Sequence, residues 1–315
     1  MMMFSSLKLV ILGAGHVGSH CGMALAWRRV CDEIVLVDIL EEKAVAQADD
    51  ISDSLSFLPS APTVRAGSVA DCADADIMVI AIGASCQPGE TRLDLLPISI
   101  RALQELMAQL KALPLSGLVI TITNPADIVA DYVRRALGLP RERCFGTGTL
   151  LDTGRLIRIL SEETGVARGS IFAFSMGEHG DSSMIPYSQI RLGGLPMDAF
   201  PQVDRNGILR LTRSRGTDII AGKGSTEFGI GQALAHLCRC ILEDGKQVLP
   251  LSVQLQGEYG QSGLHCGVPC RVGRKGIEAI IPLSLTGEEQ AQFNQSCAVI
   301  KQHIAMAEGI ASPGS

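Results

Sequence analysis

Short runs of almost purely apolar residues alternate with helix-like stretches in the first half of the chain. The apolar runs lie at residues 7–12, 33–37, 77–82 and 118–122, and the helix-like stretches near 16–29, 41–57, 97–113 and 126–137. Runs in which nearly every residue is apolar are typical of parallel strands covered on both faces. Strands that alternate with helices form right-handed βαβ units. The pattern therefore predicts an α/β fold with a doubly wound parallel sheet.

The second half of the chain carries a different pattern. Helix-like stretches lie near 152–165, 204–222, 228–244 and 286–307, and strand-like stretches near 170–176, 186–192, 247–255, 265–272 and 277–281. No repeat, low-complexity stretch or flexible linker stands between the halves. For this length we expect two domains, the sheet domain in residues 1–146 and an α+β domain in residues 147–315 that closes over it.

Composition narrows the class of protein. Among 315 residues, 46% are hydrophobic and 19% charged, which excludes a disordered chain. The net charge of −6 and an aromatic content of 4% argue against a nucleic-acid partner. Charged or turn residues interrupt every apolar run before it is long enough to cross a bilayer, so we expect no membrane segment. The apolar surplus must then be buried in a core or a subunit interface.

The ten cysteines show no CxxC pair and no zinc-ribbon spacing, so we expect reduced thiols packed as small hydrophobic residues. His16 and His20 are spaced for one helix face but have no third ligand near them in sequence, so no metal site is expected. The first eight residues lack a long basic region and a cleavage site. We expect a cytoplasmic location.

A glycine-rich turn follows the first apolar run and opens a helix-like stretch. Its residues are Gly13, Ala14, Gly15, His16, Val17 and Gly18. In a GxGxxG turn the first glycine makes the bend, the second admits a pyrophosphate, and the third lets the helix pack closely on the strand. Asp38 lies 20 residues after Gly18, at the end of the second run. Its carboxylate suits a ribose diol and repels a 2′-phosphate, which favours NAD over NADP.

Three further segments carry residues with chemistry. They are the loop 83–92 with Arg92, the segment 151–155 with Asp152 and Arg155, and the glycine-flanked turn 176–182 with His179. The loop follows a strand and therefore lies at the carboxyl end of the sheet, where ligands bind in this class of fold. Taken singly, each residue has an ordinary alternative as a solvated loop charge, a helix cap or a turn residue. The function depends on their occurring together.

Together, the motifs resemble those of the L-lactate/malate dehydrogenase family, nearest to its bacterial L-lactate dehydrogenase branch. The resemblance runs from about residue 7 to about residue 302. It rests on GAGHVG (13–18), LVD (36–38), PGETRLDL (88–95), TNP (123–125), GTGTLLDTGR (146–155), GEHGDSS (177–183), KGSTEFGIG (223–231), GEY (257–259) and GVP (267–269). It implies a Rossmann domain, NAD as cofactor, a small 2-hydroxy or 2-oxo acid as substrate, and a dimer or tetramer.

The resemblance implies a role for each matching residue. His179 would exchange a proton with the substrate oxygen, Asp152 would orient its ring, and Arg92 would polarise the carbonyl. Arg155 would bind the substrate carboxylate with two parallel hydrogen bonds. The remaining matches are Asn124 for substrate and nicotinamide, Thr226 and Gln87 for the substrate pocket, and Gly83, Ala84 and Ile230 for the cofactor.

Two departures from the family pattern bear on specificity and regulation. Malate enzymes carry an arginine six positions before the loop arginine and typical lactate enzymes a glutamine, but this chain carries Cys86. We expect pyruvate and lactate to lead, with 2-hydroxyisocaproate-type substrates as an alternative and malate disfavoured. The two anion ligands that many bacterial relatives use for fructose 1,6-bisphosphate are replaced by Ile157 and Phe172, so we expect no activation through that site. An NAD-binding scaffold without activity is the competing class.

Overall fold

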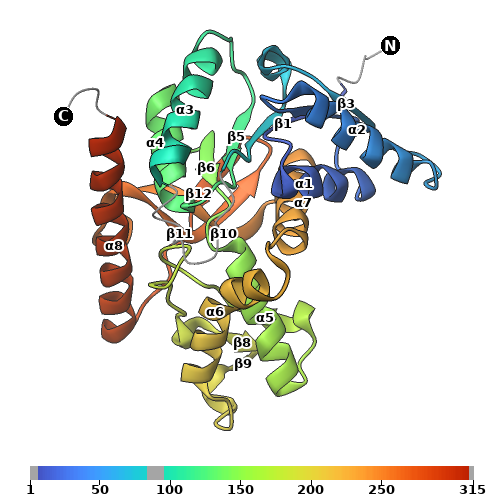
Figure 1. The fold of residues 1–315 in the computed structure, drawn as a ribbon. Helices are drawn as coiled ribbons and strands as arrows, with labels where there is room; N and C mark the ends of the chain where they lie inside the picture. The colour runs from blue at the N-terminus through green and yellow to red at the C-terminus, as the bar shows by residue number, and fades with distance from the viewer. Residues whose placement is uncertain (1–5, 84–95, 312–315) are drawn as a thin grey trace.

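A nine-stranded sheet runs through the computed structural model, which describes residues 6–83 and 96–311 (Figure 1). Its order in this part of the chain is β12-β11-β10-β6-β5-β4-β1-β2-β3. The strands are β1 (Lys8–Leu12), β2 (Glu33–Val37), β3 (Thr63–Ala66), β4 (Ile77–Ile80), β5 (Leu118–Thr121), β6 (Cys144–Gly146), β10 (Gln247–Gln256), β11 (Ser262–Gly273) and β12 (Gly276–Ile280). The pairs from β6 to β3 are all parallel, which confirms the doubly wound α/β fold.

Helices cover both faces of this sheet (Figure 1). They are α1 (His16–Trp27), α2 (Glu41–Leu55), α3 (Leu96–Lys111), α4 (Ala126–Leu137), α5 (Leu150–Thr164), α6 (Arg205–Lys223), α7 (Phe228–Leu242) and α8 (Gly287–Ala311). Short 3-10 turns lie between them: η1 (Val69–Asp74), η2 (Arg168–Ser170), η3 (Tyr187–Gln189), η4 (Met197–Ala199) and η5 (Glu258–Gly260). In the described residues, no helix is both long and apolar enough to cross a membrane.

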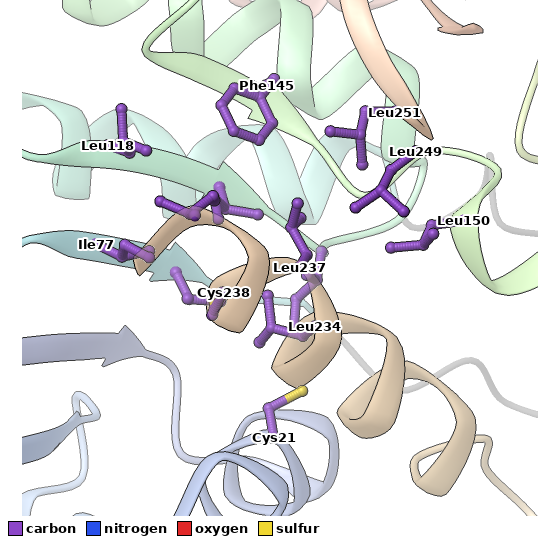
Figure 2. Packing of buried hydrophobic residues seen from close by; sticks show 14 of the residues in the cluster. Cys21, Ile77, Leu118, Phe145, Leu150, Leu234, Leu237, Cys238, Leu249 and Leu251 are labelled. Carbon is purple, nitrogen blue, oxygen red and sulfur yellow. The ribbon is translucent and has the colours of Figure 1, made fainter. Parts of the chain in front are cut away.

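Successive strand residues feed two different cores, as the period of a strand requires. In β1, Leu9 and Ile11 join a core that contains residues of α1, α2 and α7, whereas Val10 and Leu12 join one that contains residues of α3 and α4. Figure 2 shows part of the first core, in which Leu234, Leu237 and Cys238 of α7 lie between sheet residues such as Ile77 and Leu118 and Cys21 of α1. Burial on both faces explains why these strands are continuous apolar runs.

The C-terminal strands extend the same sheet. β10 pairs antiparallel with β6, Ser252 opposite Gly146, and β11 and β12 follow antiparallel at the edge. The sequence therefore anticipated the α+β elements but not that they would continue the first sheet. The predicted domain division after residue 146 falls at the strand where the two parts join.

The strands predicted at 170–176 and 186–192 are wrong over most of their length. The structure has β7 (Ile171–Phe172), β8 (Arg191–Leu192) and β9 (Leu195–Pro196) in a separate small sheet. Ser175 lies outside any ladder because its N–H donates to Thr153 Oγ1 at 2.9 Å and its carbonyl accepts from Thr149 Oγ1 at 2.6 Å. Side chains of the α5 region thus take the hydrogen bonds that a neighbouring strand would have made.

Candidate active site

The glycine-rich turn between β1 and α1 uses its glycines for different reasons. Gly13 has a φ of +109°, and a Cβ there would lie 2.6 Å from the carbonyl oxygen of Ala81. A Cβ at Gly18 would lie 1.8 Å from the carbonyl oxygen of Gly13. At Gly15 the nearest described atom to such a Cβ is Lys43 Nζ, at 3.8 Å. The fold itself therefore requires the first and third glycines, while the second leaves open space beside the turn.

The open space lies at the N-terminus of α1. Gly15 is the N-cap residue, and no side chain in the described chain caps the helix there. Uncapped N–H groups and the helix dipole favour an anion at such an end. His16 is exposed and Val17 packs partly against the first core, which leaves both beside this space. The residues present fit a dinucleotide pyrophosphate.

Asp38 lies next to the glycine turn, directly after β2. Its Oδ2 accepts from the N–H of Ala14 at 2.8 Å, and its Oδ1 accepts from the N–H of Leu40 at 3.1 Å. Lys43 Nζ is 3.5 Å from Oδ2. The carboxylate is thus fixed in position, with acceptor capacity left for the hydroxyls of a ribose.

The two histidines of α1 lie one helical turn apart, and His20 contacts the backbone of His16. His20 Nδ1 lies 2.7 Å from the carbonyl oxygen of His16, one turn earlier, and its ring packs edge-on against Phe228. Within residues 6–83 and 96–311, no group of three or more His, Cys, Asp or Glu side chains is arranged to hold a metal ion.

A second cluster joins the start of α5 to the turn after β7. The carboxylate of Asp152 contacts two groups at once: Oδ2 lies 2.6 Å from His179 Nδ1, and Oδ1 accepts from Arg155 Nη1 at 2.8 Å. The three side chains are between 9% and 13% exposed. A carboxylate at Nδ1 selects the tautomer with the proton on Nδ1, which leaves Nε2 for proton exchange. A guanidinium beside the ring supplies positive charge for an anion.

The backbone of His179 is held by a second carboxylate, that of Asp127 in α4. Its Oδ2 accepts from the N–H of His179 at 2.8 Å, and its Oδ1 accepts from the hydroxyl of Ser252 at 2.5 Å. Burial raises the pKa of Asp127 to about 6. Our sequence analysis missed this residue. The signal was an aspartate among Ala126, Ile128 and Val129, on a helix whose buried residues are apolar apart from Asp127 and Asp131.

Other candidates lie on segments that end near this cluster. Asn124 is exposed between β5 and α4, three residues before Asp127. Thr226 and Ile230 flank the start of α7, where a Cβ at Gly229 would lie 2.8 Å from Leu151 and one at Gly231 would lie 3.0 Å from the carbonyl oxygen of His20. The start of α7 therefore packs between α5 and α1. Because α5 carries Asp152 and α1 follows the glycine turn, Thr226 and Ile230 lie on a segment between the two parts of the site.

The loop after β4 is only partly described. Gly83 is exposed at its start, and a Cβ there would lie 3.7 Å from Thr123 Cγ2. Four predicted site residues lie outside the described residues: Ala84, Cys86, Gln87 and Arg92.

Two family models together match nearly the whole chain. The family model for the lactate/malate dehydrogenase NAD binding domain matches residues 7–146, and the model for the lactate/malate dehydrogenase alpha/beta C-terminal domain matches residues 149–310. The chain belongs to the lactate/malate dehydrogenase family. As a member of this family it is an NAD-dependent oxidoreductase, which confirms the predicted cofactor.

Relatives of this dehydrogenase are similar over nearly their whole length. An L-lactate dehydrogenase of Fusobacterium nucleatum is 40% identical over 310 residues, covering 96% of this chain and 97% of the relative. The ligand-bound minor L-lactate dehydrogenase of Enterococcus mundtii is 32% identical with a TM-score of 0.92, covering 96% and 98%. The Cryptosporidium parvum lactate dehydrogenase, solved with lactic acid and NAD, is 26% identical with a TM-score of 0.93, covering 97% and 99%.

Proposed function

We propose that this dehydrogenase interconverts a small 2-oxo monocarboxylic acid and its L-2-hydroxy acid, with pyruvate and lactate as the leading pair. The observation that carries the proposal is the carboxylate of Asp152, which holds an imidazole and a guanidinium together in one partly enclosed cluster. This cluster offers a proton donor and a carboxylate ligand side by side. The relatives named as L-lactate dehydrogenases support the choice of substrate.

In the proposed mechanism His179 gives a proton to the keto oxygen during reduction and takes one from the hydroxyl during oxidation. Asp152 keeps the ring oriented and stabilises the imidazolium before the proton leaves. NADH supplies the hydride when bound, and Gly15, Asp38 and Ile230 would hold it. Asn124 would orient the substrate oxygen beside the nicotinamide.

Arg155 is proposed to bind the substrate carboxylate. Its planar guanidinium offers two parallel N–H donors, which a lysine cannot. The ion pair with Asp152 keeps the guanidinium next to His179, so a bound carboxylate places the 2-oxo group near the proton donor. Arg92, with Thr226 and Gln87, would complete the pocket and polarise the carbonyl.

Cys86 is proposed to set the side-chain preference. A dicarboxylate would lack the arginine that malate enzymes use as a counter-charge, and burial of an unpaired carboxylate is costly. Because cysteine is smaller and less polar than glutamine, we expect tolerance of bulkier 2-oxo acids, the 2-hydroxyisocaproate-type alternative.

The test is kcat/KM with NADH for pyruvate, 2-oxobutyrate, 2-oxoisocaproate and oxaloacetate. We expect pyruvate to be used best and oxaloacetate worst. A clear preference for oxaloacetate would overturn the proposed specificity. A preference for 2-oxoisocaproate would overturn pyruvate as the leading substrate and favour the 2-hydroxyisocaproate-type alternative.

Regulation and assembly are part of the same proposal. Ile157 and Phe172 offer no charge to fructose 1,6-bisphosphate, so we propose that it does not activate this enzyme through the usual site.

We propose a homo-oligomer, because Phe57, Phe228 and Trp27 are 91%, 61% and 56% exposed. A reducing, cytoplasmic location is supported by the nine described cysteines, which are all free and buried. Residues 1–146 are proposed as the cofactor domain and 147–315 as the substrate domain.

A further inference from the structure

The C-terminal helix α8 contacts the turn that carries His179, at groups to which the proposed mechanism gives no role. α8 packs against α3, α4 and β11 (Figure 1). Ser296, on its inner face, is fully buried. Its hydroxyl oxygen accepts from the N–H of Glu178 at 2.8 Å and lies 3.1 Å from Ser182 Oγ. The helix therefore holds the backbone immediately before His179.

Gly177 and Ser296 fit each other sterically. Gly177 has a φ of +90°, and a Cβ there would lie 2.4 Å from Ser296 Oγ. The hydroxyl of the helix thus occupies the space that the glycine leaves open. Any side chain at position 177 would displace α8 or the turn.

The carboxylate of Glu178 connects the turn to a second residue of α8. Its Oε2 accepts from the hydroxyl of Ser182 at 2.5 Å and from the N–H of Ser182 at 3.2 Å, which closes the turn around His179. Its Oε1 lies 3.7 Å from His303 Nδ1, and both side chains are 14% exposed. Nδ1 of His303 makes no hydrogen bond in the described part of the chain, and Glu178 is the acidic side chain recorded within ion-pair distance of it there.

Ser296 and His303 lie seven residues apart, two helical turns, and therefore on one face of α8. That face accepts a hydrogen bond from the backbone N–H of Glu178 through Ser296 and places the His303 ring 3.7 Å from the Glu178 carboxylate. Asp127 holds the N–H of the next residue, His179, from α4. The two successive peptides on either side of Glu178 are thus held from two helices that are far apart in sequence, the first by Ser296 of α8 and the second by Asp127 of α4.

We propose that Ser296 and His303 of α8 are positioning residues for His179, acting through Glu178. This inference rests on the proposed function, in which His179 exchanges the proton. The ring must keep its geometry to within a fraction of an ångström for efficient proton transfer, and such precision comes from the residues behind the reacting group. The substrate carboxylate binds Arg155 and the cofactor binds α1, so loosening Glu178 should change kcat and leave KM and NADH affinity unchanged.

The test compares His303→Leu with Gln302→Leu, a matched change at the adjacent exposed position of α8. Pyruvate reduction gives kcat and KM, and NADH fluorescence gives cofactor affinity. We expect His303→Leu to lower kcat by about tenfold, the scale that a small misplacement of a catalytic group produces. Gln302→Leu should match the wild type, and His303→Gln, which keeps an N–H donor, should restore most of the rate.

A double-mutant cycle with Glu178→Gln separates coupling from general damage. If His303 acts through Glu178, the two changes together should cost no more than the larger of them. Equal kcat in His303→Leu and Gln302→Leu, or two losses that multiply, would overturn the proposal. If His303→Leu does not fold, Glu178→Gln carries the test, with the same fall in kcat expected at unchanged KM and an unchanged kcat overturning the proposal.

Failure of this inference is distinguishable from failure of the proposed function. A His179→Asn variant that still reduces pyruvate would remove the function and the inference together. An inactive His179→Asn beside a fully active His303→Leu would remove the inference alone.

Discussion

At the scale of single residues, the cluster depends on one carboxylate with two partners. Asp152 contacts both His179 and Arg155. In Asp152→Asn, the neutral amide stabilises neither the imidazolium nor the guanidinium. We expect kcat/KM for pyruvate to fall by about 100-fold or more, the range of general acid–base catalysis. Steady-state kinetics checks this, with NADH affinity as the control that should not change; retention of wild-type kcat/KM would contradict it.

The buried pair of His265 and Asp131 makes a prediction about pH. His265 is fully buried with Nδ1 3.2 Å from Asp131 Oδ1, and burial lowers the pKa of its imidazole below the ordinary histidine value of 6.5. The imidazole of His265 therefore binds a proton more readily in the unfolded chain than in the folded one. The contribution of neutral His265 to the free energy of unfolding is fully present above pH 6.5, the pKa of the unfolded chain. It is lost as the pH falls through the lower pKa of the folded state.

We expect a smaller loss of Tm between neutral and mildly acidic pH in His265→Gln than in the wild type. Asp131 keeps its ion pair with Arg135, at 2.7 Å, in that variant. Thermal unfolding across this pH range is the measurement. Parallel Tm curves for the two proteins would show that His265 carries none of the pH dependence.

At the scale of elements, two glycines of the turn between β1 and α1 are expected to have different roles: Gly18 is needed for folding and Gly15 for binding of the cofactor. Gly15→Ala adds a methyl group whose nearest described neighbour is Lys43 Nζ at 3.8 Å, whereas Gly18→Ala drives one to within 1.8 Å of a backbone carbonyl oxygen. We expect Gly15→Ala to keep the wild-type Tm and lose at least about tenfold in NADH affinity, because pyrophosphate contacts need close backbone approach. Gly18→Ala should lower Tm by several degrees. Undiminished NADH affinity in Gly15→Ala would contradict this reading.

The sequence predicted the elements whose signal is local. Continuous apolar runs marked β1, β2, β4 and β5, and helical periodicity marked the helices that cover them. The short strands β3 and β6 were missed. Thr63–Ala66 is mixed in polarity at the sheet edge, and Cys144–Gly146 has too few residues for a pattern. The segment 170–176 was misassigned because the hydroxyls of Thr149 and Thr153 replace a neighbouring strand.

For the site, the motifs supplied His179, Asp152 and Arg155, which the structure brings together. They did not indicate Asp127 or Ser296, because an aspartate or serine on a buried helix face has no sequence pattern that names its distant partner. Such contacts arise only when α4 and α8 pack on the turn from other parts of the chain.

At the scale of the whole molecule, exposed apolar side chains predict association. Trp27 at the end of α1 donates its indole N–H to Ser54 of α2 at 3.1 Å yet remains 56% exposed, and Phe57 beyond α2 is 91% exposed. A second copy of the chain would bury both. Sedimentation at working concentrations should give a dimer or tetramer, and Phe57→Glu should weaken it. A monomeric wild type would contradict the predicted assembly.

In the proposed mechanism His179, oriented by Asp152, exchanges the proton with the substrate oxygen. The most direct test of this exchange is kcat/KM for pyruvate reduction, followed by NADH absorbance, in the wild type and in His179→Asn. We expect an active wild type and a variant that binds NADH equally well but loses activity by about 100-fold or more. A wild type that binds NADH but reduces no 2-oxo acid, or a His179→Asn variant with wild-type turnover, would contradict it.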